Sequence, residues 1–289
     1  ARQKPYIVYD NNSPAIKKMY DDLRAMSEYR GMFISNDDAV ENVTSDTLIV
    51  VLDTHRPSML PCPKLIEKAS KVVLIDHHRR STDFINPCSL IYHEPYASST
   101  CEMATELLEY MNLGSSLTTV EAECLYTGIL MDTKNFIVKT GVRTFEAAAY
   151  LKRNGADLTK VRKMSRESME TYRIRAKAIS EAEILYGRFA IATLVGIGVD
   201  SPTVIGAQVA NELLDIDGIE ASFVLTGVHE RVYISARSID EVNVQKIMEE
   251  FGGGGHLTVA GAQLVDVSLE EAKNIIHETL RYLISKGEI

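Results

Sequence analysis

The 289-residue sequence lacks any run of about 18 apolar residues, so no segment is expected to span a bilayer. Its first residues lead directly into Tyr6–Tyr9, without the long apolar core of a secretory signal peptide. It has four cysteines and no CxxC pair. A zinc ribbon is therefore not expected, and reduced, mostly buried thiols of a cytosolic protein are favoured over disulfides.

Basic side chains are also scarce, with 31 Lys and Arg against 40 Asp and Glu and a net charge of -9. A surface that binds duplex nucleic acid is usually basic. We therefore expect no duplex nucleic-acid partner and, for any phosphate ligand, local basic groups or metal ions. The 45% hydrophobic content is that of a globular protein, and the length predicts about two domains.

The first half of the chain alternates short apolar runs with helical patterns. The runs are continuous, as in residues 48–52, which is typical of strands buried on both faces of a parallel sheet. The alternation predicts an α/β fold with a doubly wound parallel sheet over residues 1–164. Strands are expected at Tyr6–Tyr9, Met32–Ser35, Thr47–Asp53, Lys71–Asp76 and Leu90–His93, with helices at 14–26 and 61–69.

The second half predicts a smaller domain after a helical region. Residues 99–183 are nearly all helical in pattern, and residues 165–183 contain no Pro or Gly, which predicts a helical linker. An α+β domain is expected over residues 184–289, with a four-glycine loop before its last strand. Its expected strands are 189–195, 221–227, 231–235 and 262–267, and its expected helices are 204–214, 244–251 and 269–286.

Acidic residues and histidines lie at the ends of three predicted elements. Asp53 ends one strand, Asp76-His77-His78 ends the next, and Asp132 ends a helix. Ligands of open parallel sheets bind at the carboxyl ends of strands, and this donor set suits a divalent cation such as Mn²⁺. Asp76 is suited to orient an imidazole. Asp53 alone fits a turn residue equally well. His55 and His93 are expected to be structural or solvent-exposed.

Three further sequences are candidates for binding an anion. Successive glycines at 252–255, followed by His256, let backbone N–H groups approach a phosphate, although they also fit a flexible turn. Arg237 at a strand end is suited to a bidentate phosphate contact. The sequence Ser98-Ser99-Thr100 opens a helix, where it fits anion binding and ordinary N-capping equally well.

Together, Asp76-His77-His78 and Gly252-Gly253-Gly254-Gly255-His256 resemble the motifs of the DHH/DHHA1 phosphoesterase superfamily. Residues 76–80, 98–103 and 140–146 are similar to its GdpP-type cyclic-di-AMP phosphodiesterases. The resemblance implies two domains with a cleft between them and a dinuclear Mn²⁺ site. Asp53 would bridge the ions and His77 and Asp132 would bind one of them. His78 and Asp76 would be the catalytic residues.

The resemblance also implies a substrate and a setting. Substrate-binding residues would be Ser98, Ser99, Thr100, Arg237, Gly253, Gly254, Gly255 and His256. The implied reaction is hydrolysis of cyclic-di-AMP to linear pApA. The chain would be the cytoplasmic domain of a membrane-anchored parent protein, and a homodimer is one possible oligomeric state. A nanoRNase and pAp phosphatase of the same superfamily, acting on short linear oligonucleotides, and an inactive nucleotide-binding module remain alternatives.

One family motif is not found in the sequence. The superfamily has a His-x-x-x-Asp-x-Asp run after its first strand, whereas the first fifty residues here contain no histidine and no Asp-x-Asp. Tyr6–Tyr9 is similar to the second strand of the family. We therefore expect the chain to begin after the first motif, with one metal position incomplete and apolar sheet edges exposed.

Overall fold

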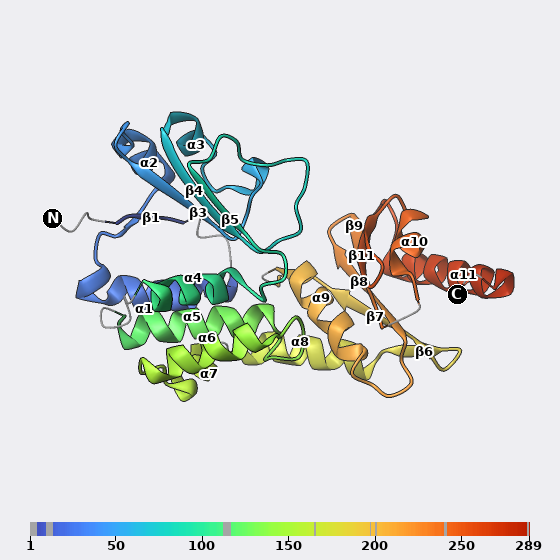
Figure 1. Cartoon of the computed structure of the whole chain (residues 1–289). Helices are drawn as coiled ribbons and strands as arrows, with labels where there is room; N and C mark the ends of the chain where they lie inside the picture. Colours follow the sequence, from blue (N-terminus) through green and yellow to red (C-terminus); the bar gives the residue numbers. More distant parts are fainter. Residues whose placement is uncertain are drawn as a thin grey trace. The chain divides into compact units, whose positions relative to one another are not determined.

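The computed structural model of the protein describes residues 5–9, 14–111, 117–164, 166–196, 198–199, 201–239, 242–287 and 289. The chain divides into two compact units, Ala1–Arg166 and Glu167–Ile289 (Figure 1). Within the described ranges no helix is both long and apolar enough to cross a membrane. Each unit is described by itself below.

The parallel strands of the first unit follow the five apolar runs that the sequence predicts, but they form two sheets. Strand β1 (Ile7–Val8) pairs with β2 (Phe33–Ile34). A separate sheet has the order β3 (Leu48–Leu52), β4 (Lys71–Asp76), β5 (Leu90–His93). The sequence predicts one parallel sheet, and the structure has two. Among the described strands β3 pairs only with β4, so β1 and β2 form a separate sheet.

The edge strand β3 leaves apolar side chains in contact with solvent. Leu48, Val50 and Leu52 alternate along one face of it, and each is about half exposed. In the central strand β4, by contrast, Val72 and Leu74 are buried. Apolar side chains are thus exposed on one face of β3.

Helices cover the strands of the first unit and pack on one another. The apolar faces of α5, α6 and α7 form one core, which contains Ile129, Leu151 and Val161. Helix α5 begins with a capping box between Thr118 and Glu121. The helices are α1 (Pro14–Ala25), η1 (Ser27–Tyr29), α2 (Asn36–Asn42), η2 (Pro57–Met59), α3 (Lys64–Lys68), α4 (Thr100–Tyr110), α5 (Thr119–Asp132), α6 (Val142–Arg153) and α7 (Leu158–Met164).

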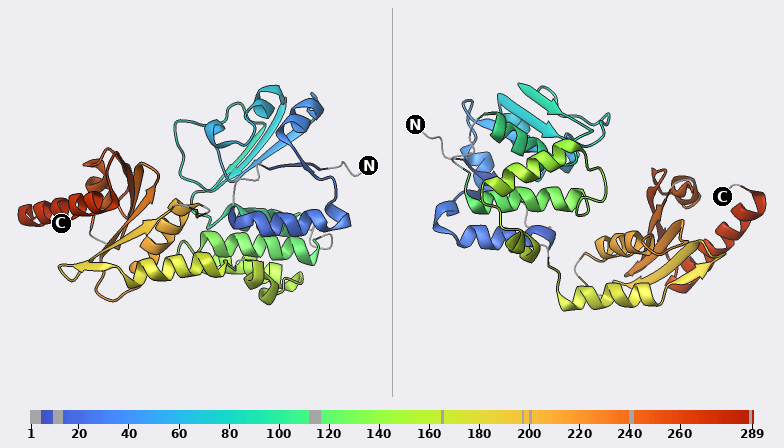
Figure 2. Two further views of the ribbon diagram at one scale, coloured as in Figure 1. Left: turned by 180° about the vertical axis from the view of Figure 1, so that it is seen from behind. Right: turned by 60° about the horizontal axis from the view of Figure 1, so that its bottom comes forward.

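The second unit is a six-stranded sheet with helices on both faces (Figure 2). Alternate residues of β7 (Phe189–Val195) face opposite cores. Phe189 packs with α10 (Val244–Glu249) and α11 (Leu269–Lys286), whereas Ala190 packs with α8 (Met169–Ser180) and α9 (Pro202–Leu213). The sheet order is β10 (Gly254–His256), β11 (Val259–Val265), β9 (Arg231–Ser238), β8 (Ala221–Val228), β7 (Phe189–Val195), β6 (Glu183–Leu185). The helices are α8 (Met169–Ser180), α9 (Pro202–Leu213), α10 (Val244–Glu249) and α11 (Leu269–Lys286).

Two segments of the second half differ from their expected roles. Ser165 lies outside the described residues, and most of the predicted linker 165–183 is helix α8, whose Ala178 is buried in the core of the second unit. The prediction that the four glycines form a loop is wrong for Gly254 and Gly255. These two residues belong to β10 and pair with β11. Glycines carry no side-chain periodicity, so the sequence pattern could not indicate this strand.

Candidate metal centre and nucleotide-binding residues

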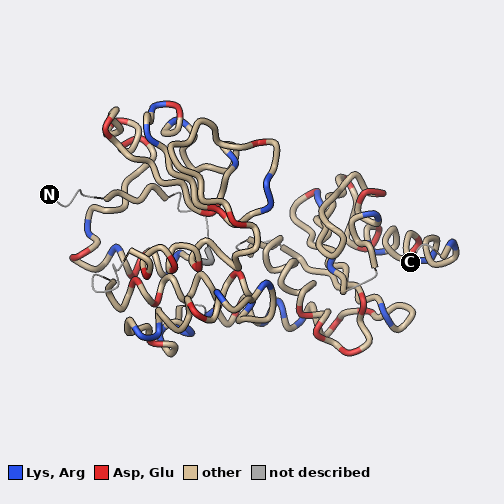
Figure 3. Tube along the Cα trace, in the orientation of Figure 1, with Lys and Arg blue, Asp and Glu red and all other residues tan. Residues whose placement is uncertain are grey.

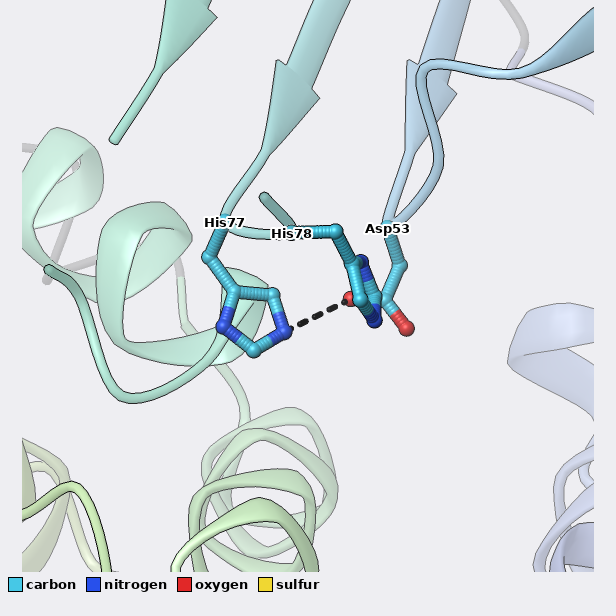
Figure 4. A group of neighbouring side chains, drawn as sticks. All are labelled: Asp53, His77 and His78. Carbon is cyan, nitrogen blue, oxygen red and sulfur yellow. Dashed lines mark ion pairs between the residues drawn. The ribbon is translucent and has the colours of Figure 1, made fainter. Parts of the chain in front are cut away.

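The ends of β3 and β4 bring together Asp53, His77 and His78 (Figure 4). The Nε2 atom of His77 lies 3.5 Å from Oδ1 of Asp53 and 3.9 Å from Oδ2 of Asp132, the last residue of α5. One ligand atom from each of Asp53, His77 and His78 lies within 4.8 Å of the other two. The residues predicted at three element ends therefore meet at one edge of the sheet.

The ring of His77 has one nitrogen with a partner and one without. Its Nδ1 lies 3.3 Å from the carbonyl oxygen of Ala97, which can only accept, so Nδ1 carries the proton. Its Nε2 is buried and has no hydrogen-bond partner in the described part of the chain. Buried polar atoms are normally satisfied, so a bare imidazole nitrogen facing two carboxylates fits a bound cation.

The carboxylates of Asp53 and Asp132 both lie within 4 Å of Nε2 of His77. Asp53 has a φ of 65°, which turns its backbone sharply after β3, and its Oδ1 accepts a hydrogen bond of 2.9 Å from Oγ1 of Thr100. Burial raises the pKa of Asp132, and the charge of Asp53 raises it further, while His77 opposes both. A divalent cation would relieve this repulsion, and carboxylates with imidazole suit Mn²⁺.

Asp76 is fully buried and faces two histidines. Its Oδ2 accepts from Nδ1 of His55 at 2.5 Å, and its Oδ1 accepts from Nδ1 of His78 at 2.8 Å. Burial alone would raise the pKa of Asp76, but the hydrogen bonds from His55 and His78 lower it below its usual value. The carboxylate therefore fixes the His78 ring, with Nδ1 protonated and Nε2 left for another partner.

Sequence reasoning missed the connection of His55 to this site. Its ring is buried, stacks on Phe84 with centroids 5.1 Å apart, and accepts from the N–H of Ser81 at Nε2 over 3.1 Å. Nδ1 therefore holds the proton that is donated to Asp76. His93, also expected to be structural or exposed, is partly buried and donates from Nε2 to the carbonyl of His78 at 2.6 Å.

The start of α4 places three hydroxyl groups beside the site, all in buried residues. Ser99 is the N-cap and accepts from the N–H of Glu102, and Ser98 donates to the carboxylate of the same residue at 2.5 Å. Thr100 donates to Asp53. Capping is thus observed at Ser99, and Thr100 positions a candidate metal ligand.

In the second unit, Arg237 and His256 lie in one row of the sheet. Both pair with Val259, so the three residues occupy one register position across β9, β11 and β10 and share a face. The guanidinium of Arg237 donates to the carbonyl of Ala236 at 2.8 Å, and burial lowers its pKa. His256 is exposed.

The glycines before His256 have different environments. A Cβ at Gly253 would lie 2.2 Å from the carbonyl oxygen of Gly261, and one at Gly255 would lie 2.4 Å from that of Val259. At Gly254 nothing lies within 4 Å. Close packing on β11 therefore explains Gly253 and Gly255, whereas a Cβ at Gly254 would meet no described atom.

The distribution of charge agrees with a cation site in the first unit. Figure 3 shows acidic residues gathered where β3 and β4 end, the position of Asp53 and Asp76. The basic residues Arg79 and Arg80 follow His78 directly. The guanidinium of Arg80 lies over the ring of Phe84, with its Cζ 4.4 Å from the ring centroid.

Known proteins include relatives that are similar to most of this chain. The chain is 44% identical over 273 residues to the cyclic-di-AMP phosphodiesterase GdpP of Geobacillus thermodenitrificans, covering 94% of this chain and 41% of that protein. It is 42% identical over 265 residues to the cyclic-di-AMP phosphodiesterase PdeA of Listeria monocytogenes, covering 90% of this chain and 40% of that protein. The chain thus spans about two fifths of the length of these relatives.

The fold has a counterpart among solved structures, an exopolyphosphatase-related protein from Bacteroides fragilis. The TM-score is 0.75 at 22% identity, covering 91% of this chain and 80% of that one, so this likeness shows the fold. The family model for the DHH family, N-terminal domain, matches residues 5–129, and that for the DHHA1 domain matches residues 187–285. The chain therefore belongs to the DHH family and joins its N-terminal domain to a DHHA1 domain.

Proposed function

We propose that this chain forms the catalytic part of a Mn²⁺-dependent phosphodiesterase that hydrolyses cyclic-di-AMP to linear pApA. The observation that carries the proposal is the identity of 44% and 42%, over at least 90% of the chain, to two proteins named as cyclic-di-AMP phosphodiesterases. The carboxylate–imidazole site of the first unit and the row with Arg237 and His256 in the second unit each support it, because a cyclic dinucleotide presents phosphates and bases.

The cation would be held by Asp53, His77 and Asp132, with the bare Nε2 of His77 as the central ligand atom. When bound, Mn²⁺ supplies Lewis acidity and positive charge that offset the charge of a phosphodiester. Thr100 fixes the carboxylate of Asp53 by its hydrogen bond. The carbonyl of Ala97 keeps the proton of His77 on Nδ1, so that Nε2 stays free to bind.

The other side chains would handle protons and hold the nucleotide. Water adds to one phosphorus, the bond to the 3′ oxygen breaks, and that oxygen takes up a proton to become a hydroxyl. In this proposal Nε2 of His78 takes a proton from the attacking water and returns it to the 3′ oxygen, since Asp76 holds the Nδ1–H and leaves Nε2 free to accept. Arg237, Gly253, Gly254, Gly255 and His256 would hold the nucleotide, and Ser98, Ser99 and Thr100 would order the start of α4 beside the phosphate.

The test is incubation of the chain with cyclic-di-AMP and Mn²⁺, with a chelator control and ion-exchange separation of products. Chelator-sensitive release of pApA is the expected result. Rapid release of AMP would instead indicate a nanoRNase. Binding without turnover would indicate an inactive nucleotide-binding module.

The cation site has a separate test that does not depend on turnover. In His77→Asn, Mn²⁺ affinity measured by calorimetry should fall by about tenfold or more, because the central ligand atom is removed. The matched control is His229→Asn, which changes an exposed histidine of the second unit at a positive φ that Asn tolerates. Equal affinity in the two variants would contradict the assigned site.

A further inference from the structure

A hollow of about 610 Å³ opens beside the candidate cation site of the first unit. Its walls include Ala97, whose carbonyl holds His77, and Phe136, which lies in the loop that follows Asp132. Both walls are therefore tied directly to proposed cation ligands. Its volume is within the range of small-molecule binding sites, which is about 300–1,000 Å³.

The walls of the hollow expose large apolar side chains to solvent. Tyr96 is 94% exposed, Ile137 80% and Phe145 56%. The ring of Phe145 stacks on Phe136, with centroids 5.4 Å apart and an interplanar angle of 23°. Clustered apolar side chains that face water mark binding surfaces, and exposed aromatic rings are the usual platforms on which nucleobases stack.

The loop that forms one wall has an unusual backbone. Lys134, Asn135, Phe136 and Lys139 all have positive φ, which is costly for residues other than glycine. Hydrogen bonds to Thr133 hold the loop: its carbonyl accepts from the N–H groups of Ile137 and Val138 at 2.8 and 2.9 Å. These hydrogen bonds hold the loop in its unusual backbone conformation, so the apolar wall is in place before any ligand binds.

The charge of the residues that line the hollow indicates which class of ligand it suits. Lys139 is the one charged residue among the nine that line it. In a chain of net charge -9, an apolar hollow with a cation and no carboxylate suits an aromatic group attached to an anion. A nucleotide whose phosphate lies at the neighbouring cation site has this chemistry.

We propose that this hollow binds the nucleobase adjacent to the cleaved phosphodiester, in contact with Tyr96, Ile137 and Phe145. The inference rests on the proposed function for the identity of the substrate. Lys139 contacts a phosphate oxygen of the same nucleotide. The hollow thereby holds one of the two bases of the dinucleotide in the first unit.

Binding is tested with a fluorescent reporter, since the chain contains no tryptophan. Tyr96→Trp places a single tryptophan in the hollow, and Tyr110→Trp places one at the end of α4, at a tyrosine that is 91% exposed and does not line it. With Mn²⁺ present, AMP or cyclic-di-AMP should quench the emission of the first variant saturably and leave the second unchanged. Unchanged emission of Tyr96→Trp, while calorimetry detects nucleotide binding, would overturn the proposal.

Kinetics provide the second measurement. Tyr96→Ala and Phe145→Ala should each raise the KM for cyclic-di-AMP by about tenfold, with kcat within about twofold and unchanged circular dichroism, because one base stack is lost. Tyr110→Ala should match the wild type. The base site would be refuted if both variants kept the wild-type KM, or if they changed the oligomeric state and not the KM. If no dinucleotide is hydrolysed yet AMP still quenches Tyr96→Trp, the proposed function fails and the base site stands.

Discussion

Replacement of His55 by leucine is expected to destabilise the first unit strongly. The imidazole is the shared partner of two groups: Asp76, whose Oδ2 accepts its Nδ1–H at 2.5 Å, and the N–H of Ser81, which donates to its Nε2 over 3.1 Å. His55 and Asp76 are both buried, so water cannot replace these bonds without opening the structure. Leucine would leave Oδ2 of Asp76 without its donor and the N–H of Ser81 without its acceptor, while His78 would still donate to Oδ1 of Asp76.

The magnitude follows from these two losses. A buried polar group without a partner costs about 1–3 kcal/mol, so the free energy of unfolding should fall by about 2–6 kcal/mol. Hydrogen exchange of amides in β3 and β4 reports the first unit separately from the second. The matched control is His229→Asn at an exposed position of the second unit, where no change is expected in these amides.

A double-mutant cycle tests the cause of the loss. In an Asp76→Asn background the buried charge is gone, so His55→Leu should cost less than in the wild type by more than about 0.5 kcal/mol. A loss of equal size in both backgrounds would show that the bond to Ser81 or the packing on Phe84, and not the hydrogen bond to Asp76, explains the effect. A loss below about 0.5 kcal/mol in the wild type would refute the reasoning altogether.

Two further predictions concern the glycine run and the cysteines. Gly253→Ala should lower the stability of the second unit by about 1–3 kcal/mol, because its Cβ would lie 2.2 Å from a carbonyl oxygen. Gly254→Ala, which meets nothing within 4 Å, should keep the melting midpoint but lower AMP affinity in calorimetry. Burial raises the pKa of Cys101 to about 12 and of Cys124 to about 11, so both should react with iodoacetamide at pH 8 far more slowly in the native than in the urea-unfolded chain. In the unfolded chain these thiols ionise near their ordinary pKa of 9.0, whereas in the folded chain they stay protonated. The free energy of unfolding should therefore fall as pH rises above about 9, which urea midpoints measured from pH 7 to 10.5 would show.

The strands of the first unit were predictable because each is a continuous apolar run. Residues 48–52 and 71–76 are strands as expected, since burial on both faces leaves this pattern in the sequence. Their division into two sheets was not predictable, because which strands pair depends on contacts distant in the chain. Strand β10 was missed for a different reason: glycines leave no pattern of burial.

The candidate site was partly predictable for the same reason. Asp53 and His77 were predicted because they end neighbouring parallel strands, which meet at one edge. The partnership of His55 with Asp76 spans 21 residues and depends on the register of β3 against β4, which no local pattern reveals. The hollow around Tyr96 depends on a loop whose backbone conformation is unusual for its residue types.

The convergence of Asp53 and Asp132 on His77 also links the folding equilibrium to the concentration of divalent ions. A ligand that binds the folded chain alone adds RT ln(1 + [L]/Kd) to stability, about 2.7 kcal/mol when its concentration is a hundred times Kd. The Nε2 of His77 lies within 4 Å of both carboxylates only in the folded first unit. Melting temperature therefore becomes a measure of cation occupancy, and the chain is expected to be least stable in chelator.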